Sequence, residues 1–193
     1  MRPASTRLLG AILFVSLAPS LRAERLPEQS DRIVDYQINV GLDPETKQLE
    51  GREHLVWRNP SRDTISELWF HLYLNAFKNT RSTFFEESSG RNREFRFVAG
   101  RWGWIDVTAL KAGGTDLTSA MRFEHPDDDN HEDQTVMRVT LPQPVPPGGR
   151  VELDITFRAH LPEVYARTGY KRDFYFAGQW FPKIGVYEPA INT

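Results

Sequence analysis

The sequence predicts an all-β fold, a single antiparallel β-sandwich domain, on three observations. Short segments in which apolar and polar residues alternate recur along the chain, and this period of two is typical of half-buried strands. Turns rich in Gly and Pro separate these segments, and the chain contains 13 residues of each kind. No sustained helical period and no internal repeat accompany them.

The first 23 residues are expected to precede this domain as a cleaved secretory signal peptide. Arg2 and Arg7 come before an apolar run at 8–17, and Ala23 stands at the expected cleavage point. The run is about half of the ~20 residues that a membrane-spanning helix needs, which favours a signal over an anchor. We therefore expect an exported protein, periplasmic or extracellular, that has no membrane attachment after cleavage and whose domain covers residues 24–193.

A hairpin is predicted at the start of the domain. Apolar residues alternate over 36–42 and again over 49–57, and Asp43–Thr46 between them has turn composition. Pro44 fixes φ at the second position of that turn, and the Asp43 side chain can accept hydrogen bonds from the backbone.

The remaining strands follow in order. The segment 68–74 has bulky apolar side chains on both faces, which predicts a strand that is buried on two sides. The same alternation predicts three further strands, at 105–109, 137–141 and 151–157. Gly113-Gly114 follows the first of these as a turn, and the Pro-rich segment 142–149 is expected to form a stiff turn between the other two.

Two polar stretches interrupt the pattern. Residues 78–103 mix Arg with Phe and Trp, a combination found in proteins that bind single-stranded nucleic acid. Because the chain carries 24 basic and 26 acidic residues, we instead expect a long loop whose Phe side chains are fixed in the core, and no nucleic-acid partner. Residues 126–133 contain five acids, but they lack the Gly and the terminal Glu of an EF-hand loop, which favours a solvated hairpin loop over a calcium site.

The sequence contains no complete catalytic pattern. The absence of Cys excludes thiol catalysis, disulfides and thiolate zinc sites. The nearest approach to H-E-x-x-H begins at His131, and Thr135 stands where the second His must be. The other histidines are scattered over predicted strands, so a three-His site built on strands stays open as an alternative to structural roles. We expect no metal and no catalytic residue in this chain.

Several motifs, taken in their order along the chain, resemble those of one family. They are Y-x-I-x-V-x-L-D-P with L-x-G (Tyr36–Gly51), L-x-F-H-L-Y-L-N-A-F (Leu68–Phe77), L-P-x-P-V-x-P-G-G-x-V-x-L-x-I-x-F (Leu141–Phe157) and G-Q-W-F-P-K (Gly178–Lys183). Over nearly all of residues 33–188 the chain resembles the saddle-like N-terminal β domain of bacterial zinc aminopeptidases of the aminopeptidase-N-like, gluzincin kind. The resemblance implies a fragment that stops before the catalytic domain, in which the zinc is expected.

The resemblance also implies the candidate site residues. In that family the segment equivalent to Gln179–Pro182 reaches the active-site cleft and helps to hold the free amino end of a peptide. Gln179 matches a position of this kind, because a carboxamide oxygen accepts hydrogen bonds from an ammonium group. Phe181 departs from the Gln or Glu that many members carry there. Trp180 and Phe181 are then expected to line a hydrophobic subsite or to pack against the missing domain.

Two functions follow as hypotheses. The first is a non-catalytic N-terminal domain of an exported zinc metallo-aminopeptidase-like protein, inactive alone, with the missing catalytic domain and a peptide substrate as its partners. The alternative is a free-standing secreted β-sandwich module that binds a peptide or a carbohydrate.

Overall fold

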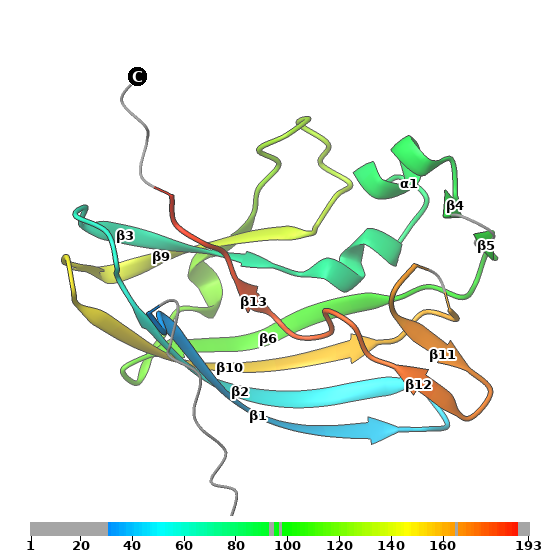
Figure 1. The fold of residues 1–193 in the computed structure, drawn as a ribbon, viewed down its shortest axis with the longest axis horizontal. Helices are drawn as coiled ribbons and strands as arrows, with labels where there is room; N and C mark the ends of the chain where they lie inside the picture. Colours follow the sequence, from blue (N-terminus) through cyan, green and yellow to red (C-terminus); the bar gives the residue numbers. More distant parts are fainter. Residues whose placement is uncertain (1–30, 93–94, 97, 165, 189–193) are drawn as a thin grey trace, which may run out of the picture. The chain divides into compact units, whose positions relative to one another are not determined.

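The computed structural model describes residues 31–92, 95–96, 98–164 and 166–188, so the expected signal peptide at 1–23 lies outside the described residues. Two antiparallel sheets dominate (Figure 1). The first sheet has the order β1 (Val34–Asp43), β2 (Gln48–Arg58), β10 (Arg150–His160), β6 (Trp104–Ala112), β7 (Thr115–Asp116). The second sheet has the order β13 (Lys183–Ile184), β3 (Ile65–His71), β9 (Val136–Val145), β8 (Met121–Phe123).

The inward faces of the two sheets form one hydrophobic core, which confirms the predicted all-β sandwich. Alternate residues of β2 and β10 are buried, as the period of two requires. The largest fully buried side chains come from both sheets and from the segment after β3: Phe70, Phe77, Phe157, Leu55, Leu72, Leu74, Ile105, Leu110, Met137, Leu153 and Ile155.

The predicted turns form by the expected chemistry. Asp43 Oδ1 accepts a hydrogen bond of 2.8 Å from the Glu45 backbone N–H, and β1 pairs with β2 in register on both sides of this turn. Gly113 and Gly114 have φ values of 53° and 85° between β6 and β7. Glycine suits a two-residue hairpin turn of this kind because it adopts positive φ without a steric penalty.

Two strand predictions differ from the structure. The predicted doubly buried strand at 68–74 ends at His71, and the 3-10 helix η1 (Tyr73–Phe77) begins two residues later. His71, on the second face of the strand, is exposed. The predicted turn at 142–149 is shorter, because β9 continues to Val145. The pairing of β9 with β3 shifts register between Ile65 and Glu67 of β3. Proline is tolerated in a strand at such an irregularity.

The two polar stretches contain short elements that contact each other. The first holds α1 (Thr83–Ser88) and the pair β4 (Arg91–Asn92) and β5 (Phe95–Arg96), and Phe85 of α1 is buried in the core as predicted. The second joins β8 to β9 as a hairpin loop, with η2 (Thr118–Ala120) before β8. Asp128 and Asp133 accept hydrogen bonds from the hydroxyl and the backbone N–H of Thr83, so the acidic loop fixes the start of α1.

No helix in the described part of the chain is long and apolar enough to cross a membrane.

Candidate functional site

The candidate site lies on the segment that joins the two sheets near the end of the described chain. β11 (Gly169–Lys171) and β12 (Phe174–Phe176) form a hairpin, after which residues 178–184, called the crossing segment here, end in β13. β13 pairs with β3 at the edge of the second sheet, as Figure 1 shows in red. The sequence predicted a last strand or a crossing segment at this place, and the structure contains a crossing segment that follows β12 and ends in the short strand β13.

A backbone kink opens the crossing segment. A Cβ atom on Gly178 would lie 2.4 Å from the carbonyl oxygen of Arg167, so only glycine fits this position. Gln179 has φ of 54°, a left-handed conformation that is uncommon for a residue with a side chain. The Gln179 side chain is exposed. Strained backbone of this kind persists only where the surrounding structure holds it.

The next two residues attach the kink to the first sheet. The rings of Trp180 and Phe157 have centroids 6.0 Å apart, and the rings of Phe181 and Tyr36 have centroids 5.3 Å apart in an edge-to-face arrangement. Both Trp180 and Phe181 are half-buried. The structure therefore brings the three predicted site residues together: two contact this domain's own sheet, and Gln179 is presented to solvent beside them.

Exposed apolar side chains flank the crossing segment. The exposed fractions are 65% for Phe174, 55% for Phe176 and 75% for Val186, which are high values for residues of this kind. Val186 also lines a cavity of about 340 Å³ between β3 and residues 184–188, together with Trp57 and Trp69. Exposed apolar surface beside a polar group is typical of an interaction site.

One buried acid of the first sheet, Glu53, is a candidate that sequence reasoning missed. Glu53 occupies an inward position of β2 and is only 2% exposed, and neither of its carboxylate oxygens has a hydrogen-bond partner in the described structure. Burial raises the pKa of Glu53 to about 8. A glutamate at an inward position of the alternating pattern was the signal available in the sequence.

The residues described here do not fit a zinc site. No group of three or more His, Asp or Glu side chains among them is arranged to hold a metal ion. At the predicted near-match, the Thr135 hydroxyl donates a hydrogen bond of 2.5 Å to Asp133, and the rings of His125 and His131 lie edge to face with centroids 4.7 Å apart. The candidate site itself presents the exposed Gln179 carboxamide and apolar side chains, which are suited to recognition through hydrogen bonds and apolar contacts.

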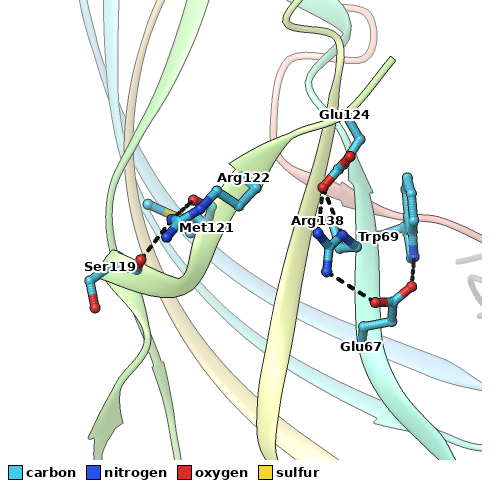
Figure 2. Close-up of polar contacts among 7 residues, drawn as sticks. All are labelled: Glu67, Trp69, Ser119, Met121, Arg122, Glu124 and Arg138. Carbon is cyan, nitrogen blue, oxygen red and sulfur yellow. Dashed lines mark hydrogen bonds and ion pairs between the residues drawn. The ribbon is translucent and has the colours of Figure 1, made fainter. Parts of the chain in front are cut away.

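A second polar cluster, on the outward face of the second sheet, is fully paired. Arg138 of β9 contacts Glu124 at 2.6 Å and Glu67 at 3.2 Å, and the Trp69 indole N–H donates to Glu67 at 2.9 Å (Figure 2). Because each charged group already has a partner, this cluster connects β3, β9 and the end of β8 and leaves no charge free to bind a ligand.

Comparisons with known proteins give a likeness in structure only. No family model matches the chain, and no curated protein matches it. It is similar to a two-domain M1 zinc metallopeptidase bound to L-tryptophan, with 16% identity and a TM-score of 0.39 over 74% of this chain and 24% of the other. It is similar to the M1 zinc metallopeptidase of Deinococcus radiodurans bound to a Tyr-Ser-Ala substrate, with 14% identity and a TM-score of 0.40 over 77% and 25%.

A third structure, a two-domain M1 zinc metallopeptidase bound to L-arginine, has 19% identity and a TM-score of 0.40 over 76% of this chain and 26% of the other. The chain thus spans about a quarter of the length of these structures.

Proposed function

We propose that residues 24–193 form the non-catalytic N-terminal β domain of an exported zinc metallo-aminopeptidase-like protein. In this proposal the domain supports the catalytic domain and helps to recognise the free amino end of a peptide. The observation that carries it is Gln179, an exposed carboxamide on a left-handed kink that is held by two ring contacts to the first sheet. The family named in this proposal comes from the resemblance of the sequence motifs.

Gln179 suits the recognition of a peptide amino terminus. An ammonium group carries only donors, and the carboxamide oxygen of Gln179 is an acceptor with two lone pairs. A hydrogen bond to a charged group is stronger than one between neutral groups. Because Gly178 and Trp180 restrict the backbone on both sides, the backbone that carries Gln179 is already ordered before a peptide binds.

Phe181 stands where many members of the family carry Gln or Glu, and this reduces the number of polar side chains that can bind a peptide amino terminus. Where many members of the family carry a second polar side chain, the Phe181 ring contacts Tyr36 of β1. Among the three candidate residues, Gln179 is then the only one with a side-chain hydrogen-bond acceptor. We therefore expect weaker anchoring of the amino terminus than in members with two polar groups.

The catalytic domain is expected to cover the exposed apolar side chains. Phe174, Phe176 and Val186 lie on both sides of the crossing segment in sequence and are more than half exposed. Covering such surface is favourable by about 25 cal/mol per Å² of apolar area. In this proposal the catalytic domain would hold the zinc ion, whose chemistry would be the activation of a water for peptide hydrolysis.

The test compares the purified chain with the protein translated from the complete reading frame. We expect the chain alone to bind no stoichiometric zinc and to cleave no aminoacyl amide, and the complete protein to do both. Hydrolysis by the chain alone that persists after contaminating peptidases are removed would contradict the proposal. A native reading frame that ends at Thr193, combined with binding of peptides or glycans by the chain, would support the free-standing binding module instead.

A further inference from the structure

Glu53 lies on the inward face of β2, between β1 and β10 in the first sheet. In the first sheet, Glu53 pairs with Ile38 of β1 and with Ile155 of β10. Tyr36, two residues before Ile38 on β1, pairs with Leu55 of β2. Phe157, two residues after Ile155 on β10, pairs with Gly51 of β2. Tyr36, Glu53 and Phe157 therefore form one diagonal across the inward face, with Glu53 at its centre.

The crossing segment lies along this diagonal. Trp180 contacts the Phe157 ring, and the next residue, Phe181, contacts the Tyr36 ring. The Ile184 backbone N–H donates a hydrogen bond of 3.1 Å to the Tyr36 hydroxyl. Two neighbouring residues thus cover the two ends of a diagonal whose centre is a carboxyl group without a partner.

The groups that face Glu53 provide no compensating charge. On the inward face of β1 the only titratable side chain is Tyr36, and β10 contributes none on its inward face between Val151 and Ala159. The residues of β3 that point into the core are apolar, and His71 is exposed. Lys183 of the crossing segment is exposed as well, and no ion pair to Glu53 occurs in the described structure.

We propose that Glu53 is a proton-dependent latch for the crossing segment: the segment docks on the first sheet while the carboxyl is protonated, and it opens when the carboxyl ionises. An ionised carboxylate in this apolar layer requires water, and displacement of Trp180 and Phe181, which contact the two residues beside Glu53 on the diagonal, would admit it. The left-handed backbone at Gln179 favours the same opening, because the strain is released when the segment leaves the sheet.

The direction of the pH dependence follows from the raised pKa of Glu53, about 8 in the closed form against an ordinary value of 4.5. Between these values the open form has released a proton that the closed form keeps. The equilibrium constant for opening therefore rises with pH, by up to about tenfold per pH unit, and becomes constant above pH 8. The neighbouring hydroxyl does not titrate in this range, because burial raises the pKa of Tyr36 to about 12.

Hydrogen exchange of the full chain tests the latch. Amide exchange rates between pH 5 and 9, divided by the intrinsic chemical rate at each pH, give the opening constant for each segment. We expect the opening constant of residues 180–184 to rise by about tenfold per pH unit up to pH 8, and that of Ile155 in β10, which requires opening of the sheet, to stay lower at every pH.

Two variants complete the experiment. Glu53→Gln has no ionisable group, so it should abolish the pH dependence at 180–184, and Glu50→Gln, at an exposed outward position of the same strand, should leave it unchanged. If Glu53→Gln does not fold, the comparison of residues 180–184 with Ile155 in the unaltered chain still decides. Three results would overturn the latch. The opening constant of residues 180–184 could be independent of pH, it could keep its pH dependence in Glu53→Gln, or it could equal the opening constant of Ile155.

Discussion

Replacing Glu53 by methionine should stabilise the protein, and the gain should grow with pH. Methionine has a similar volume, fits an apolar environment and carries no proton. In the native chain, Glu53 keeps a proton that the unfolded chain releases above its ordinary pKa of 4.5. The native state therefore loses stability as the pH rises from 4.5 to about 8, and Glu53→Met removes this loss.

The magnitude follows from the pKa of Glu53. A rise from 4.5 to about 8, at ~1.4 kcal/mol per unit, corresponds to a total of about 5 kcal/mol. At pH 7 the expected advantage of Glu53→Met is about 3 kcal/mol, and at pH 4.5 ionisation contributes almost nothing. These values are upper bounds, because opening of the crossing segment hydrates the carboxyl before the whole chain unfolds.

Urea denaturation at half-unit steps from pH 4.5 to 8.5 measures the difference in free energy of unfolding between the two proteins. Glu50→Met on the exposed face of the same strand is the matched control, and its difference from the native chain should stay constant over this range. A Glu53→Met difference that is equally constant would refute the argument, since it would mean that Glu53 is solvated or paired in the native state.

Two further predictions concern packing and buried hydrogen bonds. Gly51→Ala should destabilise the protein by about 1–3 kcal/mol, because the new Cβ atom would lie 2.2 Å from the Phe157 ring. Gly41→Ala is the control, because its Cβ atom would have no atom within 4 Å. Equal melting temperatures of the two variants in thermal denaturation would contradict this prediction. Asn59→Ala should lower the free energy of unfolding by about 2–3 kcal/mol, because the buried Asn59 amide donates two hydrogen bonds and accepts two. Urea denaturation measures this loss, with Asn39→Ala at an exposed position as the control. Equal stabilities of the two variants would show that these bonds contribute nothing.

The sequence was sufficient for the elements that depend on local chemistry. The β1–β2 hairpin follows from a period of two and from a turn in which Asp43 accepts backbone hydrogen bonds. The strands β6, β9 and β10 follow from the same alternation. These signals are local, so they need no knowledge of which strands become neighbours.

Features that depend on distant contacts were not predictable in the same way. The alternation places Glu53 on the inward face. The hydrogen bond that attaches the crossing segment beside it joins Ile184 to Tyr36, which are separated by 148 positions, so no local pattern predicts it. The kink at Gln179 has no sequence signal, because glutamine rarely adopts positive φ and does so here between Gly178 and the ring of Trp180. The three candidate residues were found through the family resemblance, and their contacts only through the structure.

The most direct test of the central claim is the steady-state kinetics of Gln179→Ala in the protein translated from the complete reading frame. We expect KM for aminoacyl amides with a free amino terminus to rise about 10- to 100-fold, the equivalent of one hydrogen bond to a charged group. Gln37→Ala, at an exposed position on the outward face of the first sheet, should leave KM unchanged. An unchanged KM in Gln179→Ala would contradict the claim that this domain binds the amino end of the substrate.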